Sequence, residues 1–181
     1  MKVKLMKTEI EIPEGVTCDV QDKTVTTKGT KGEVVRLFNH PKVGIKMADN
    51  KLVLESNDAT KREKTMHNTF RAHLKNMFKG AVEGHTYKLK ICSGHFPMNA
   101  SVNNNEFVIK NFLGEKVPRV LKIKEGAEVK IEGEIIIVTS LSKETAGQVA
   151  ADIESLTRIK GRDLRIFQDG IYITEKDGKQ M

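Results

Sequence analysis

Residues 12–25 read IPEGVTCDVQDKTV, and residues 123–136 read IKEGAEVKIEGEII. When Ile12 is laid on Ile123, the two stretches share isoleucine, glutamate and glycine, followed by apolar residues at every second position. A period of two is that of a half-buried β-strand. Each alternation is broken by a short turn, at Asp22-Lys23 and at Glu132-Gly133. We therefore predict that the chain contains two copies of one small module.

Two helices are expected where apolar residues recur at spacings of three and four. The first is predicted at residues 61–79, closed by Gly80; its apolar stripe consists of Met66, Phe70, Leu74 and Met77. A separate basic face carries Lys64, Arg71 and Lys75, with His67 at its edge. The second helix is predicted at residues 143–158 with Ser142 as N-cap. Its buried stripe consists of Ala146, Val149, Ala150, Ile153 and Leu156.

Further strands are expected at residues 43–46 with 51–55 and at residues 87–92 with 107–110. The run Asn103-Asn104-Asn105 suits a turn, because asparagine tolerates left-handed backbone. The predicted fold class is α+β, with two repeated modules, each a small antiparallel sheet covered by one helix. Residues 1–82 form the first module, residues 83–181 form the second, and the link lies at residues 81–84.

Composition indicates a folded protein that meets a polyanion. The net charge is +7 and the hydrophobic content 38%, with a pI near 9.3. A dispersed positive charge on a folded chain favours a nucleic-acid partner over a disordered tail.

Two cysteines make no disulfide framework, and Cys18, in an apolar alternation, is expected to be a buried free thiol. The longest aliphatic run, Ile135 to Val138, is too short to span a membrane. Residues 1–7 interleave charge with apolar residues, unlike a signal peptide. A cytoplasmic location is expected.

The positive charge is segregated in the second half of the chain. Residues 1–82 hold 16 basic and 10 acidic residues, and residues 83–181 hold 15 and 14. Within the second half, however, residues 110–124 carry a net +4 and residues 158–165 a net +3. We predict that these two stretches converge on one face, where their arginines can fork onto phosphate. The alternative is a set of solvated lysines without a partner.

The segment Gly29-Thr30-Lys31-Gly32 matches the GXXG pattern with which KH domains clamp a nucleic-acid backbone. A KH clamp lies between two helices, whereas this segment follows a predicted strand. We therefore favour a glycine-bounded turn that presents Lys28 and Lys31 to phosphate.

Catalytic and metal-binding patterns are weak. Cys92 and His95 have ligand-like spacing and His85 is a third candidate, but no second pair stands at zinc spacing. The sequence contains no P-loop, dinucleotide fingerprint or nucleophile elbow. Ser93 and His95 lack an indicated carboxylate partner. We expect no cofactor and no enzymatic activity.

Arginine and aromatic residues surround an Asp-Gly turn in residues 165–172, RIFQDGIY. This combination is common on RNA-binding surfaces, because aromatic rings and guanidinium groups both stack on bases. The alternative places Phe167 and Tyr172 in the core beneath the last strand. For these two side chains taken alone, we favour the core.

The sequence resembles, over essentially its whole length, the L-six family of large-subunit ribosomal proteins in its archaeal and eukaryotic branch. The most specific parts are residues 95–98 (HFPM), 111–116 (NFLGEK) and 165–172, supported by residues 71–84 and 28–32. Thr30 stands where the family often has proline, and Ser142 where an acidic or amide cap is commoner. The resemblance implies binding to large-subunit rRNA, chiefly through the second module, near the sarcin-ricin loop and the translation-factor site.

Two alternatives to a ribosomal scaffold protein are a free-standing regulatory RNA-binding module and an RNA-modifying enzyme. The expected partners are large-subunit rRNA, neighbouring large-subunit proteins and translation factors, without a membrane. For the first module two partners remain open, because it could contact either RNA or protein. The residues expected to contact rRNA are Lys28, Lys31, Lys110, Asn111, Lys116, Arg119, Lys122, Arg158, Lys160, Arg162 and Arg165.

Overall fold

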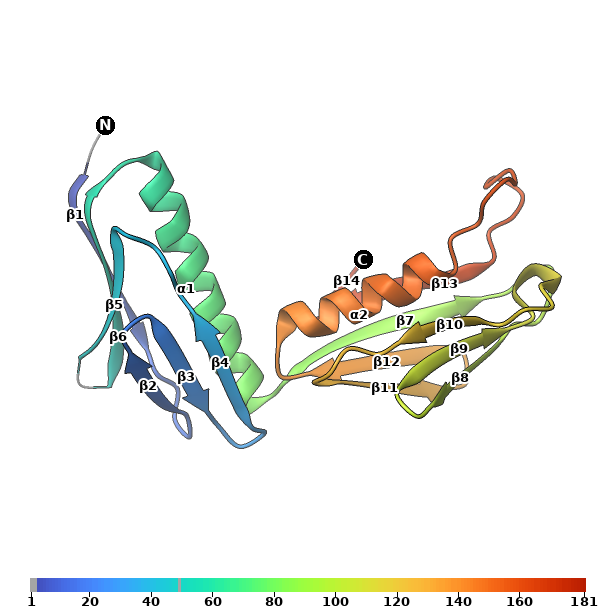
Figure 1. The fold of residues 1–181 in the computed structure, drawn as a ribbon, viewed down its shortest axis with the longest axis horizontal. Coiled ribbons are helices and arrows are strands. Elements are labelled where there is room, and N and C mark those ends of the chain that lie inside the picture. Colours follow the sequence, from blue (N-terminus) through green and yellow to red (C-terminus); the bar gives the residue numbers. More distant parts are fainter. Residues whose placement is uncertain (1–2, 49) are drawn as a thin grey trace. The chain divides into compact units, whose positions relative to one another are not determined.

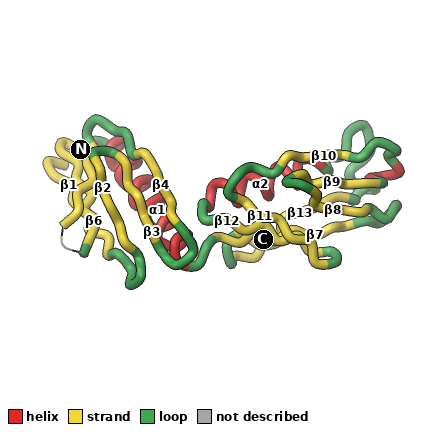
Figure 2. Tube along the Cα trace, turned by 60° about the horizontal axis from the view of Figure 1, so that its bottom comes forward, coloured by secondary structure: helices red, strands yellow, loops and turns green. Residues whose placement is uncertain are grey.

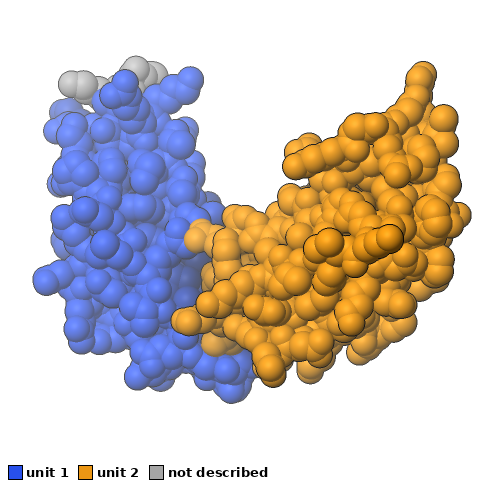
Figure 3. Space-filling model, turned by 45° about the vertical axis from the view of Figure 1, so that its right-hand side comes forward, with its two compact units in different colours: residues 1–84 blue, residues 85–181 orange. Residues whose placement is uncertain are grey.

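The computed structural model describes residues 3–48 and 50–181. The chain divides into two compact units, residues 1–84 and residues 85–181 (Figure 3). Each unit combines antiparallel strands with one helix, which confirms the predicted α+β class. Neither of the two helices in the described residues is both long and apolar enough to cross a membrane.

Within the described residues, the first unit contains six strands and one helix (Figure 1). Its elements are β1 (Val3–Glu11), β2 (Thr17–Gln21), β3 (Thr24–Lys28), β4 (Glu33–Leu37), β5 (Val43–Ala48), β6 (Lys51–Ala59) and α1 (Lys61–Val82). The strands form two three-stranded antiparallel sheets, in the orders β1-β6-β5 and β2-β3-β4. The prediction of one sheet per module was therefore too simple.

Helix α1 turns its predicted apolar stripe inward. Phe70, Leu74 and Met77 are buried, in one cluster with Leu52 and Leu54 of β6. Burial of such side chains stabilises a fold by about 1.5–3 kcal/mol each. The predicted helix phase is thus confirmed. His67 was placed wrongly at the edge of the basic face, because it is completely buried and bonds Thr8 of β1 at 2.9 Å.

Local chemistry fixes both ends of α1. Thr60 and Glu63 form a capping box, in which the Glu63 carboxylate accepts the backbone N–H of Thr60 at 2.9 Å. The hydrogen bonds from Thr60 hold the pKa of Glu63 at about 2. The prediction that Gly80 closes the helix was wrong, because Gly80 is buried inside α1. The helix ends at Val82, and Gly84, with φ 77°, supplies the left-handed turn after it.

The second unit contains eight strands, a short 3-10 turn and one helix. Its elements are β7 (His85–Cys92), β8 (Asn99–Asn103), β9 (Glu106–Lys110), the 3-10 turn Phe112–Gly114, β10 (Arg119–Lys122), β11 (Ala127–Glu132), β12 (Ile135–Ser140), α2 (Lys143–Leu156), β13 (Gly170–Lys176) and β14 (Lys179–Gln180). A five-stranded sheet has the order β11-β12-β7-β13-β14, and a three-stranded sheet the order β10-β9-β8. Both are antiparallel.

Helix α2 lies over the five-stranded sheet (Figure 1). The Ser142 side chain accepts the N–H of Thr145 and so confirms the predicted N-cap. The predicted stripe is buried except for Leu156, which is partly exposed. The helix ends at Leu156, before the predicted end at Arg158.

The duplication is real, but the predicted alignment of Ile12 with Ile123 was wrong. Matching sheet orders pair β1 with β7, β6 with β12 and β5 with β11, and likewise β2, β3 and β4 with β8, β9 and β10. The helices that begin at Lys61 and Lys143 are then equivalent. The predicted alignment instead lays β2-β3 on β11-β12, hairpins that occupy different sheets. Each sheet contains an alternating hairpin, so alternation alone did not distinguish them.

Turn positions follow from the strand register. Glu132 pairs with Ile135, so the turn lies at 133–134 and not at the predicted Glu132-Gly133. Asn104 and Asn105 have positive φ and join β8 to β9, as predicted. The stretches 87–92 and 107–110 lie in different sheets, because β7 pairs with β12 and β13 instead.

Candidate nucleic-acid interface

Three loops of the second unit meet at the end where α2 stops. They are residues 93–98 between β7 and β8, residues 111–118 between β9 and β10, and residues 157–169 between α2 and β13. Figures 1 and 2 show these connections at the same end of the unit. We call this set of three loops the loop end.

Asp169 joins two of these loops. Its side chain is 2% exposed and accepts hydrogen bonds from the backbone N–H groups of Gly94 at 2.6 Å and His95 at 2.9 Å. His95 Nδ1 lies 2.5 Å from the other carboxylate oxygen. Burial by itself raises the pKa of Asp169, but the hydrogen bonds from His95 and Gly94 outweigh it and hold the pKa below its usual value. The buried carboxylate is thereby stabilised in its charged form.

Aromatic stacking orders the same region. The Phe167 ring stacks on His95 with centroids 4.7 Å apart, and the guanidinium of Arg162 lies 4.7 Å from the Phe167 ring centre. Phe167 is only partly buried, and Tyr172 is 44% exposed. The preference for both side chains as core residues was therefore wrong, because both rings are at least partly exposed and Phe167 lies beside Arg162.

Arg119 joins the loop of residues 111–118 to the end of α2. It forms a two-armed ion pair with Glu115 and donates to the carbonyl of Leu156 at 2.7 Å. The same nitrogen lies 3.3 Å from the carbonyl oxygen of Arg158, and the guanidinium lies 4.2 Å from the Phe112 ring centre. The basic stretches 110–124 and 158–165 thus touch at this side chain. Its hydrogen bonds lower the pKa of Glu115, and the charge of Arg162 nearby adds to that effect.

The predicted RNA-contacting residues have different environments. In the described residues no ion pair involves the exposed side chains of Lys110, Lys116, Lys122, Arg158 and Lys160. Arg165 is exposed and pairs with Asp163 at 2.8 Å. Asn111 has φ 60° and donates from its side chain to the carbonyl of Pro97, so it shapes its loop. Arg119 is occupied by internal contacts, which favours a structural role for it.

The glycine-bounded turn after β3 packs on the end of α1. The Lys31 N–H donates to the carbonyl of Ala81 at 3.0 Å, and the Thr30 hydroxyl donates to the carbonyl of Val82 at 3.2 Å. A Cβ at Gly29 would lie 2.5 Å from the Ala81 oxygen, so only glycine fits there. The turn joins two strands and is not a KH clamp. Lys28 pairs with Glu33, and Lys31 is exposed.

The two histidines of the metal hypothesis make other contacts. His85 lies 3.1 Å from Asp177, and His95 bonds Asp169. No three potential ligands of these types gather in the part of the chain that the structure describes. Cys18 is half-buried, not fully buried, and its burial raises the pKa of the thiol to about 11.

Sequence reasoning missed Asp169 and gave no role to Phe112. Asp169 bonds residues 74 and 75 positions away in the chain. The Asp-Gly step before β13 indicated only a turn, and no local pattern marks a partner so far away.

Two α+β modules in tandem, with a basic and aromatic loop end on the second, define a class of small nucleic-acid-binding scaffold. The sequence model of one family, described as ribosomal protein L6, matches residues 12–84 and 96–170. The first of these segments begins just before β2 and the second just before β8, in agreement with the corrected pairing of strands.

Individual relatives match along almost their whole length. The large ribosomal subunit protein uL6 of Methanococcus vannielii is 47% identical over 175 residues, which cover 97% of this chain and 96% of the relative. The uL6 protein of Methanosarcina mazei is 45% identical over 174 residues, covering 96% of this chain and 99% of the relative. That of Methanobrevibacter smithii is 44% identical over 172 residues, covering 95% and 97%. The chain therefore belongs to the ribosomal protein L6 family.

Proposed function

We propose that this protein is a structural constituent of the cytoplasmic large ribosomal subunit and binds large-subunit rRNA through the loop end of its second unit. The observation that carries the proposal is the gathering of exposed cations on loops that Asp169 and Arg119 fix in place. Cations held in a set geometry bind phosphate with less loss of conformational entropy than mobile ones. Family membership indicates which RNA is bound.

The finer location follows from the family resemblance. We infer that the loop end lies near the sarcin-ricin loop and the translation-factor site, with neighbouring large-subunit proteins and translation factors within reach. The first unit supplies Lys28 and Lys31 as further candidate contacts. The Lys28 charge is already paired with Glu33, so Lys31 is the stronger of the two.

Sedimentation separates the ribosomal role from the alternatives. A subunit constituent should remain with large subunits through washing in high salt, whereas a free-standing regulatory module should be released. A modifying enzyme would turn over a labelled rRNA substrate. Release of the protein at moderate salt would contradict a scaffold role.

A matched pair of double variants tests which unit carries the contact. Arg162→Ala with Arg165→Ala removes two charges from the loop end, and Lys61→Ala with Arg62→Ala removes two exposed charges from the start of α1. The first pair should weaken rRNA binding, and the second should leave it nearly unchanged. The reverse result, with both variants folded, would assign the RNA surface to the first unit.

A further inference from the structure

One face of the five-stranded sheet is left open beside the loop end. Ile171 and Leu89 point to the side that α2 covers and belong to the core. Side chains alternate along a strand, so Tyr172 and its cross-strand partner Lys90 point to the other side. Tyr172 and Lys90 are both exposed. An aromatic ring therefore stands next to a cation on an uncovered sheet face.

The Tyr172 ring is held in a fixed position. Its hydroxyl donates to the carbonyl of Gln168 at 3.1 Å. The ring lies against Gly170, where a Cβ would come within 3.2 Å of ring carbon Cζ and of the hydroxyl oxygen. Glycine at this position thus allows the ring to lie over the backbone. An aromatic group fixed in advance loses little conformational entropy when a ligand stacks on it.

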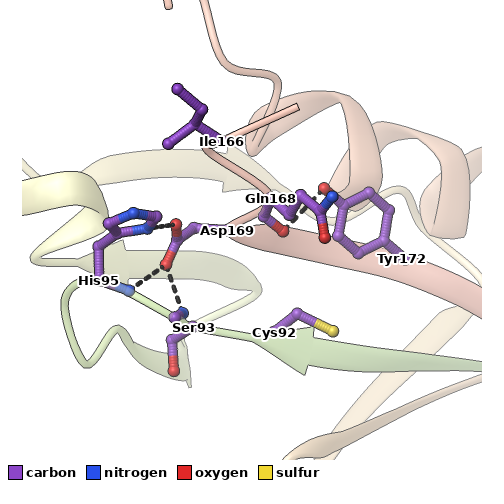
Figure 4. A pocket seen from close by; sticks show the side chains of 8 residues that line it. Cys92, Ser93, His95, Ile166, Gln168, Asp169 and Tyr172 are labelled. Carbon is purple, nitrogen blue, oxygen red and sulfur yellow. Dashed lines mark hydrogen bonds and ion pairs between the residues drawn. The ribbon is translucent and has the colours of Figure 1, made fainter. Parts of the chain in front are cut away.

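The ring forms one wall of an open pocket of about 570 Å³ (Figure 4), a size typical of small-ligand sites. Figure 4 shows the side chains of His95 and Tyr172 flanking Asp169. The pocket is lined by Cys92, Ser93, Gly94, His95, Ile166, Gln168, Asp169 and Tyr172. The Ser93 hydroxyl and the Gln168 carboxamide make no side-chain hydrogen bond within the described residues and are exposed. A ligand in this pocket would meet an aromatic ring together with hydrogen-bonding groups.

These groups match the chemistry of a nucleobase. A base offers a π-face to an aromatic side chain and a polar edge to amide and hydroxyl groups, and its phosphate attracts a cation. A base inside a duplex has both faces covered by its neighbours, so only an unpaired base can stack on Tyr172. We propose that this pocket binds one unpaired nucleobase of RNA, stacked on Tyr172, with Lys90 against the adjoining phosphate. The inference rests on the proposed RNA-binding function and adds a recognition element to it.

The test compares two RNA hairpins of equal stem length, both closed by the same non-nucleotide linker in place of a loop of bases, one fully paired and one with a single bulged 2-aminopurine. The full-length protein should bind the bulged hairpin about tenfold more tightly, within the range for one base–aromatic stack. Stacking on Tyr172 should also change the fluorescence of the 2-aminopurine. Tyr172→Ala should abolish both the preference and the fluorescence change, while Tyr172→Phe, which retains the ring, should keep most of both. Lys90→Ala should weaken binding to the bulged hairpin more than binding to the paired one.

The controls separate this inference from the proposed function. Arg162→Ala with Arg165→Ala should weaken binding to both hairpins by the same factor, because these charges contact phosphate. Equal affinity of the wild-type protein for the two hairpins, or a bulge preference that survives Tyr172→Ala, would overturn the base pocket while leaving the RNA interface intact. Failure of the protein to bind either hairpin would instead count against both.

Discussion

A guanidinium nitrogen of Arg119 lies 2.7 Å from the carbonyl oxygen of Leu156, the last residue of α2. The final carbonyls of a helix have no partner within it, so this side chain supplies one. In the first unit, the turn after β3 satisfies the end of α1 through the N–H of Lys31 and the hydroxyl of Thr30. Both units therefore tie the end of their helix to a three-stranded sheet, β2-β3-β4 in the first unit and β10-β9-β8 in the second, with different chemical groups.

Loss of the Arg119 contact should destabilise the second unit. Arg119→Ala removes a charged hydrogen bond to Leu156 and leaves that carbonyl without this donor, so we expect a loss of roughly 1–3 kcal/mol in the free energy of unfolding. Lys122→Ala, at an exposed position of the same strand, should cost less than about 0.5 kcal/mol. Chemical denaturation measures both. Equal midpoints for the two variants would mean that the Arg119 contacts contribute nothing net.

The close approach of Gly29 to Ala81 predicts that the first unit does not tolerate a methyl group there. Gly29→Ala would place Cβ 2.5 Å from a backbone oxygen, which must move. We expect a loss of roughly 1–3 kcal/mol. Gly44→Ala is the matched control, because a Cβ at Gly44 meets nothing within 4 Å. Thermal unfolding should show a lower midpoint for Gly29→Ala only; a similar shift for both would refute the close-contact explanation.

The buried stripe of α1 predicts a large difference between its two faces. Phe70 lies edge-on to Phe38, with ring centroids 5.0 Å apart. Phe70→Ala should cost roughly 3–5 kcal/mol, as other buried aromatic residues do. Lys64→Ala on the exposed face should cost less than about 0.5 kcal/mol. Urea unfolding of the two variants checks which face of α1 is buried. Equal destabilisation by Phe70→Ala and Lys64→Ala would contradict the assigned helix phase.

The Asp169 contacts predict a pH-dependent link between two loops. The folded pKa of Asp169 is lowered, so its stabilising contribution is present above the unfolded value of about 3.9 and is lost as pH falls through the folded pKa. At neutral pH the N–H groups of Gly94 and His95 should exchange slowly with solvent. Asp169→Asn, which removes the charge, should speed that exchange, measured by NMR, whereas Asp163→Asn on the same loop should not. Unchanged protection in Asp169→Asn would show that the loops are held by other contacts.

Salt dependence tests the electrostatic part of the RNA interface. If about six phosphates are contacted, log K for large-subunit rRNA should fall against log salt with a slope of roughly −4 to −5. Arg162→Ala with Arg165→Ala should reduce the slope by about one unit per lost phosphate contact. Filter binding between low and moderate salt measures it. A slope near zero would place the basic surface outside the interface.

Some errors of sequence reasoning share one cause. The alignment of Ile12 with Ile123 matched two hairpins whose alternation is alike, and Tyr172 was placed in the core beneath the last strand although it lies on the uncovered face of that strand. In each case the local sequence indicated a strand, but it did not indicate which strand would pair with it or which of its faces would be covered. Sheet order and register decide which hairpins are equivalent and which face of β13 is covered.

The sequence by itself determined the α+β class, the duplication, the phase of α1, the Ser142 cap and the Asn104–Asn105 turn. Each of these depends on spacing or conformational preference that can be read along the chain. Tertiary structure alone decided the equivalence of the strands, the exposure of Tyr172 and the internal contacts of Arg119 and Asp169. These depend on partners brought together from distant parts of the chain, such as Gly94 and Asp169, 75 positions apart. Strand pairing and helix packing bring such partners together, and a short-range sequence pattern does not indicate them.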